Sequence, residues 1–241
     1  MNLDIAYFRI KRAIECEEEC FLCVLEDEIE RKFVDTYLSE LVMDASARNK
    51  IIESRGFCNY HFYKMLIAAN KPGSPDGHGI ALITNSVVEQ LLLDMRKLSR
   101  YKNAFRNMLS SEEKCPACIH LAAFTYMYIQ KVIELFSLQD EAFMKLFKES
   151  KGLCIPHFAA LTRTIEEKSA GQAQNVIKII IEVEEKNLGR LNSELAEYIR
   201  RQSYEFSEEE RRAVEDVVWK SVGKLVGRHG LRLTGGLLNG E

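Results

Sequence analysis

Six cysteines and two histidines occur in two matching sets along the chain. Residues 53–62 read ESRGFCNYHF and residues 149–158 read ESKGLCIPHF, and a C-x-x-C pair precedes each segment. Three thiols and one imidazole are the usual donors of a closed tetrahedral zinc site. The spacing therefore predicts two metal centres. The predicted ligands are Cys20, Cys23, Cys58 and His61 for one ion, and Cys115, Cys118, Cys154 and His157 for the other.

The two sets keep nearly the same spacing, which indicates duplication of a whole unit. Cys20 and Cys115 are 95 residues apart, and Cys58 and Cys154 are 96 apart. We therefore predict two tandem helical repeats in a pseudo-twofold arrangement, each held together by its own Cys₃His centre, and packed as one body through their long helices. The predicted segments are an N-terminal helix (1–19), repeat 1 (20–110), repeat 2 (111–201), and a C-terminal helix with a flexible tail (202–241).

The ligands fall where helices are expected to begin. Pro116 and Pro156 suit the first turn of a helix, so Cys115 and Cys154 become the preceding cap residues. Gly56 and Gly152 suit a left-handed turn that ends one helix just before the next ligand. Residues three apart on a helix share a face and can bind one ion. Each centre is therefore expected between helix N-termini, whose free N–H groups stabilise thiolates.

Apolar residues recur at helical spacing, and no alternating strand pattern is present. The fold class is therefore predicted to be all-α. Asp44 and Asp140 are expected to cap short helices, and Ser207 with Glu210 forms a capping-box pattern. The predicted helices cover 3–16, about 25–41, 45–54, 58–70, 80–109, 115–136, a short segment after Asp140, 154–168, 172–201 and a final helix from Ser207.

Zinc, two ions per chain, is the metal that this donor set favours. An iron–sulfur cluster is an alternative, although the spacing matches no common ferredoxin pattern. Reversible thiol redox chemistry at the C-x-x-C pairs is another. A third interpretation is that the cysteines are buried core residues without a metal. It accounts well for a single cysteine but poorly for two matched sets of three cysteines and one histidine.

Composition limits the cellular compartments and the classes of binding partner that are expected for this chain. The 241 residues carry a formal net charge of −3, which gives no general attraction to nucleic acid or to anionic lipid. No apolar run reaches the ~18 residues that a membrane span needs, and the N-terminus is a poor signal peptide. Seven cysteines with C-x-x-C spacing favour metal ligation in a reducing compartment over disulfides. We expect a cytoplasmic protein.

Several chemically capable residues lie outside the two sets. Cys16 has Ser111 at the equivalent position of repeat 2, and a packed helical cysteine is expected rather than a ligand. His120 is expected on the surface or in the core, not on a metal. The acidic run at 15–19 is expected to be a solvated face. His229 lies in a basic tail of solvated character.

The doubled C-x-x-C plus G-[FL]-C-x-x-H-F arrangement resembles an uncharacterised prokaryotic family of helical proteins, known as a domain of unknown function. The resemblance covers about 20–199, and all eight predicted ligands occupy matching positions. It implies a cytoplasmic protein with bound metal and implies no particular activity.

The leading functional expectation is a metal-stabilised interaction or scaffold protein that binds a protein partner or a second copy of itself. Closed sites leave no coordination position for a substrate. A redox- or metal-responsive thiolate protein is the alternative. No catalytic motif for hydrolysis or phosphate binding is present. An enzyme with a catalytic pocket between the long helices is a further alternative.

Overall fold

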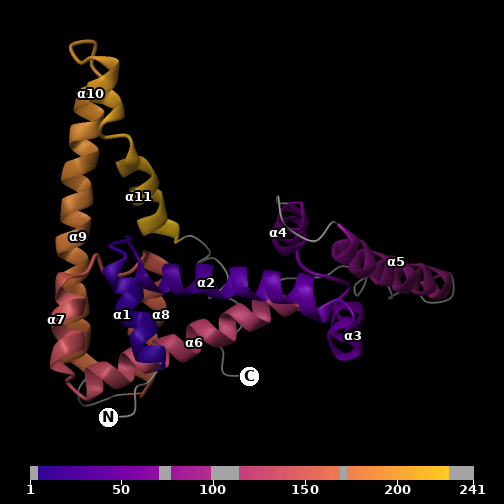
Figure 1. Ribbon diagram of the computed structural model, residues 1–241. Helices are drawn as coiled ribbons and strands as arrows, with labels where there is room; N and C mark the ends of the chain where they lie inside the picture. Colours follow the sequence, from indigo (N-terminus) through magenta and orange to yellow (C-terminus); the bar gives the residue numbers. More distant parts are fainter. Residues whose placement is uncertain (1–4, 71–76, 99–113, 169–172, 228–241) are drawn as a thin grey trace. The chain divides into compact units, whose positions relative to one another are not determined.

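The computed structural model describes residues 5–70, 77–98, 114–168 and 173–227, and over these ranges it contains helices and no strand (Figure 1). The all-α prediction is confirmed. The helices are α1 (Ile5–Glu15), α2 (Phe21–Thr36), the π-helical turn η1 (Tyr37–Leu41), α3 (Ala45–Glu53), α4 (Asn59–Ala69), α5 (His78–Leu98), α6 (Pro116–Ser137), α7 (Glu141–Glu149), α8 (Ile155–Lys168), α9 (Ala173–Arg201), α10 (Glu208–Arg212) and α11 (Asp216–Val226).

The chain divides into two compact units. Unit 1 comprises residues 1–26 and 125–241, and unit 2 comprises residues 27–124. The boundary falls inside α2 and inside α6, so the units do not coincide with the two sequence repeats. Helix α5 belongs to unit 2 and α9 to unit 1, and the pairing of these two long helices stays a prediction.

Unit 2 has its own apolar core. Rings of Phe33, Tyr37 and Phe57 meet at centroid distances of 5.4 to 6.4 Å, and Phe62 joins Phe57 at 5.6 Å. Helices α3 and α4 both pack against α5. Cysteine side chains of the candidate metal centre belong to this same core, so the centre and the packing of unit 2 are continuous.

Unit 1 has a second aromatic core. The ring of Phe136 lies 5.1 Å from those of Phe143 and Phe147, and Phe21 meets Phe147 at 6.3 Å. The last helix, α11, packs against α8 and α9, and Figure 1 shows it running alongside α9. Unit 1 is therefore built from segments near both ends of the chain, with Phe21 in its aromatic core and α11 packed against α8 and α9.

Local sequence signals determine most helix boundaries. The carboxylates of Asp44 and Asp140 accept hydrogen bonds from the N–H groups of Ala47 and Phe143, at 2.7 and 2.8 Å. The capping box of Ser207 with Glu210 is present. These caps satisfy N–H groups that the first turn of a helix leaves open.

Two helix predictions differ from the structure, and two further predictions lie outside the described residues. The helix expected over about 25–41 ends in the π-helical turn η1. The final helix is split, because α10 ends at Arg212 and α11 begins at Asp216. The predicted continuation of the 80–109 helix beyond residue 98, and the basic tail with His229, lie outside the described residues.

Candidate metal centres

The first candidate centre gathers Cys20, Cys23, Cys154 and His157, and it lies within unit 1. The Sγ atoms of Cys23 and Cys154 are 3.7 Å apart. The Nδ1 atom of His157 lies 3.0 Å from Cys154 Sγ, 3.3 Å from Cys20 Sγ and 3.5 Å from Cys23 Sγ. All four residues are at most 4% exposed. Four donors therefore point at one enclosed position.

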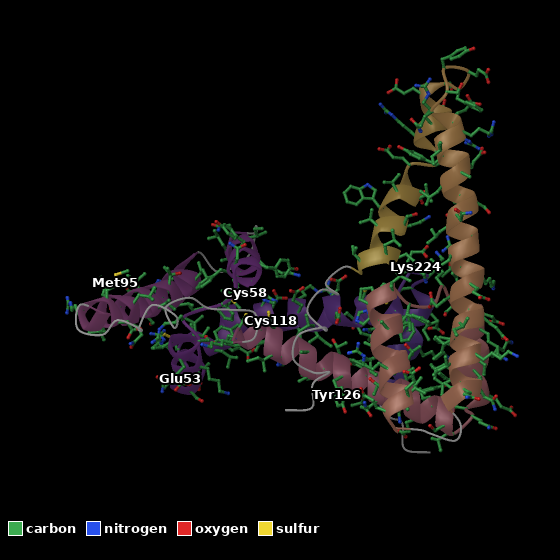
Figure 2. The ribbon with its side chains drawn as sticks, turned by 180° about the vertical axis from the view of Figure 1, so that it is seen from behind. Glu53, Cys58, Met95, Cys118, Tyr126 and Lys224 are labelled. Atoms are coloured by element: carbon green, nitrogen blue, oxygen red, sulfur yellow. The ribbon has the colours of Figure 1, made fainter. Side chains whose placement is uncertain are left out.

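The second candidate centre gathers Cys58, His61, Cys115 and Cys118, and it lies within unit 2. Figure 2 labels Cys58 and Cys118, whose Sγ atoms are 3.7 Å apart. The Nδ1 atom of His61 lies 3.2, 3.3 and 3.6 Å from the sulfurs of Cys58, Cys118 and Cys115. The four residues are at most 6% exposed. The two centres have nearly the same geometry.

These distances fit a single tetrahedral ion. Zn–S bonds of ~2.3 Å and a Zn–N bond of ~2.0 Å at tetrahedral angles place sulfurs about 3.8 Å apart and sulfur and nitrogen about 3.5 Å apart. The observed separations cluster around these values, and every ligand atom lies within 4.8 Å of the others in its group. The donor sets can hold one metal ion each.

The predicted grouping of the ligands within each repeat is wrong. Each C-x-x-C pair shares its centre with the C-x-x-H pair of the other repeat. The reason is helix length. After Cys20 the chain continues as α2 and η1 over 21–41, roughly 30 Å of helix at ~1.5 Å per residue. Helix α3 has nine residues and is too short to return the chain to the start of α2.

All four ligand pairs lie at helix N-termini, as predicted. The carbonyls of Cys20, Cys58, Cys115 and Cys154 each accept an N–H four residues later, the bond that opens a helix. Gly56 and Gly152 have φ of 97° and 74°, which confirms the left-handed turns before Cys58 and Cys154. The turn and the helix start together aim each C-x-x-H pair into its centre.

A buried carboxylate orients the histidine of the first centre. Glu26 is 2% exposed, and its Oε1 lies 3.2 Å from His157 Nε2. The hydroxyl of Thr125 donates to the same oxygen at 2.8 Å. Because Nδ1 faces the sulfurs, Nε2 is the nitrogen that donates its hydrogen to Glu26. Such carboxylate–histidine pairs fix the ring and raise its basicity in metal sites.

The second centre repeats this arrangement with different neighbours. The Oε1 atom of Glu30 lies 2.9 Å from His61 Nε2. Its Oε2 accepts from Tyr60 at 3.3 Å and forms an ion pair with Lys64. Glu30 is therefore buried but partnered by a lysine that is 31% exposed.

In each centre the side chains favour one thiolate and an imidazolium without any metal present. Burial alone would lower the pKa of His61, but hydrogen bonds with Cys115, Cys58 and Glu30 raise it to about 10. Hydrogen bonds with Cys115 and Cys118 hold the pKa of the Cys58 thiol far below its ordinary value. The pKa of His157 is raised in the same way by the Cys20 and Glu26 charges, against the effect of burial. Each cluster thus combines a thiolate with an imidazolium, ready to exchange protons for a cation.

Sequence reasoning missed Glu26 and Glu30. Glu26 follows Cys23 by three residues and therefore shares its helix face, which is a detectable signal. Among many helical glutamates, however, that signal is weak. The expectation that the acidic run is solvated is wrong at Glu19, which is buried and paired with Arg190 at 2.6 Å.

The other singled-out residues belong to neither centre. Cys16 is exposed, so the prediction of a packed cysteine is wrong. His120 lies between the rings of Phe33 and Phe124, at centroid distances of 4.9 and 4.7 Å, and burial lowers its pKa.

No helix of the described ranges is long and apolar enough to cross a membrane.

Comparisons with known proteins place the chain in a family. Neither the curated proteins nor the solved structures gave a match. A family model matches residues 1–231, nearly the full length. The chain therefore belongs to DUF6062, a family of unknown function.

Proposed function

We propose that this protein binds two zinc ions that stabilise its fold, and that it acts as a non-enzymatic interaction or scaffold protein. The observation that carries the proposal is the closure of both centres. Every ligand is buried, and each histidine uses its second nitrogen for a carboxylate. Catalytic zinc keeps an open position for water or substrate, whereas structural zinc has four protein ligands.

The compactness of the ligand sets supports a single ion over a cluster. In an iron–sulfur cluster the protein ligands are divided among two or more irons, so ligands on different irons stand further apart than around one ion. Here the ligand atoms of each group all lie within 4.8 Å. Three thiolates with one imidazole then favour zinc among single divalent ions.

Exposed apolar side chains support an interaction role. Helix α5 exposes Leu92, Leu93 and Met95, the last labelled in Figure 2. Helix α11 exposes Trp219, which is 80% exposed, together with Val222. Clusters of this kind on otherwise charged helices are typical of protein-binding surfaces. We propose a protein partner or a second copy of the chain, in the reducing cytoplasm where the six ligand cysteines stay reduced.

A redox- or metal-responsive role is the second candidate, and the sulfur geometry favours it. The pairs Cys23–Cys154 and Cys58–Cys118 each have sulfurs 3.7 Å apart. A small movement would bring either pair to disulfide distance once the metal leaves. Exposed Cys16 could act as a further thiol in such chemistry.

Metal analysis of protein purified without added metal tests the proposal. We expect close to two zinc per chain, with sulfur and nitrogen scatterers in the zinc X-ray absorption spectrum. Iron with acid-labile sulfide would replace the zinc proposal by a cluster protein. Mild peroxide separates the two roles, because a structural zinc resists release while a sensor loses it reversibly as disulfides form.

A further inference from the structure

A fully buried lysine lies beside the first centre. Lys224, in the last turn of α11, is 0% exposed and is labelled in Figure 2. Its Nζ lies 2.7 Å from Glu184 Oε2 on α9 and donates to the carbonyl of Lys151 at 2.6 Å. It also reaches the carbonyl of Glu19 at 3.4 Å. A charge buried this deeply is stable only with such partners.

Two partners of Lys224, the carbonyls of Glu19 and Lys151, belong to the two segments that carry ligands of the first centre. Glu19 directly precedes Cys20, and Lys151 lies three residues before Cys154. The other oxygen of Glu184 accepts the N–H of Leu153, the residue before Cys154, at 2.6 Å. Arg190 of α9 pairs with the Glu19 carboxylate at 2.6 Å. The Arg190 side chain is 30% exposed, so we call only the buried members, Glu19, Glu184 and Lys224, the buried ionic cluster.

The second centre is supported by different contacts. A Cβ atom added at Gly152 would collide with the Glu184 carboxylate, whereas one added at Gly56 would collide with the Phe62 ring. The segment before Cys58 is held by an ion pair of Arg55 with Asp94 at 2.6 Å, and both side chains are nearly one-fifth exposed. Water therefore reaches this pair, which weakens its contribution.

The carboxylates of the two centres, Glu26 and Glu30, are each 2% exposed, but their partners differ in exposure. Glu30, at the second centre, pairs with Lys64, which is 31% exposed. Lys64 and Tyr60 line an open groove of about 670 Å³. At the first centre the equivalent carboxylate, Glu26, is bonded to Thr125, which is 1% exposed. Solvent and small molecules therefore approach the histidine support of the second centre more easily.

From these contacts we propose that the two centres differ in function: the first holds a structural ion that leaves slowly, and the second is an exchangeable centre that gains and loses zinc readily. The inference rests on the proposed zinc binding. Releasing the first ion requires Cys20 or Cys154 to move, and both are anchored through the buried ionic cluster. Breaking a buried ion pair is costly, because a charge is left unpaired. Local opening is therefore rarer at the first centre.

The test is the kinetics of zinc release from the full-length, zinc-loaded protein into an excess of a chromogenic chelator. We expect two phases of one zinc per chain each, with rates at least about tenfold apart. In His61→Ala the fast phase should be missing, and in His157→Ala the slow phase should be missing. This assigns each phase to a centre.

Lys224→Met then tests the buried ionic cluster. Loss of an outer support typically weakens a metal site about 10- to 100-fold, so the slow phase should accelerate by that factor while the fast phase keeps its rate. Lys220→Met is the matched control. It lies one turn earlier on α11 and pairs at the surface with Asp216, so neither phase should change. If Lys224→Met does not fold, Glu184→Gln keeps an acceptor for Leu153 and should still accelerate the slow phase.

Three results would overturn the inference: release of both ions at one rate, a slow phase that His61→Ala rather than His157→Ala removes, or equal acceleration of both phases in Lys224→Met. A chain that binds no zinc at all would instead refute the proposed function. The zinc content before chelation distinguishes these cases.

Discussion

The Sγ atoms of Cys23 and Cys154 lie 3.7 Å apart although the two residues are 131 positions apart in the sequence. The second centre likewise joins Cys58 to Cys118, 60 positions apart. Each centre therefore closes a long loop of the chain. Metal binding to such a site is coupled to folding, because the unfolded chain rarely brings the ligands together.

The crossed pairing makes a prediction about a truncated chain. Residues 1–110 contain Cys20, Cys23, Cys58 and His61, the four residues of one repeat, but they hold only half of each centre. We expect this fragment to remain unfolded and to bind no zinc tightly. Circular dichroism and metal analysis check this. A folded fragment with one tetrahedral zinc would show that the repeats ligate metal independently.

Loss of one ligand should affect one centre. In Cys58→Ser the protein should retain one zinc per chain, because all ligands of the first centre are intact, and its melting temperature should fall. The matched control is Cys16→Ser, which removes an exposed cysteine outside both centres. It should keep two zinc ions and the wild-type melting temperature. Loss of both ions from Cys58→Ser would contradict two separate centres.

The carboxylates behind the histidines should tune affinity. We expect Glu26→Gln and Glu30→Gln each to weaken zinc binding at one centre by about 10- to 100-fold, as second-layer changes do in other metal sites. Competition with a chelator of known affinity measures this. Glu28→Gln, on the same helix between the two, should leave both affinities unchanged. Wild-type affinity in both Glu26→Gln and Glu30→Gln would show that these contacts do not support the ligands.

Stability at high pH should depend on Tyr37. Burial, followed by the nearby Asp44 charge, raises the pKa of Tyr37 to about 12, against about 10 in an unfolded chain. The folded state thus holds this proton more tightly, so its stabilising effect is complete below pH ~10 and is lost as the pH rises through about 12.

Comparison of wild type with Tyr37→Phe measures this dependence. The hydroxyl donates to the carbonyl of Ala47 at 2.8 Å, so the variant should lose about 1 kcal/mol near neutral pH. Denaturant unfolding at pH 8 and pH 11 should show a smaller difference between the two proteins at the higher pH. A difference that stays constant would mean that the phenol keeps an ordinary pKa in the folded state.

The sequence predicted local features well because local chemistry determines them. Caps at Asp44 and Asp140, the turn at Gly152 and the position of Cys58 at a helix start all depend on a few neighbouring residues. The eight clustered donors followed from residue type and spacing. None of these features depends on which helices meet.

Long-range features could not be predicted in the same way. Periodicity shows which face of a helix is apolar and not which distant helix covers it, so the crossed pairing of the ligands was missed. Glu19, Glu26 and Lys224 look like ordinary surface charges in the sequence. Their burial depends on partners such as Arg190 and Glu184, which come close only in the folded chain.

The crossed ligand sets also impose an order on assembly during synthesis, which proceeds from the N-terminus. The second centre has all four ligands once Cys118 has been added. The first must wait for His157 and for the lysine at position 224, although its own Cys20 is the earliest ligand made. The ribosome therefore supplies the ligands of the two centres in a fixed order. The second centre is complete first, and the first centre, whose ligands come from the earliest and latest ligand segments of the chain, is completed last.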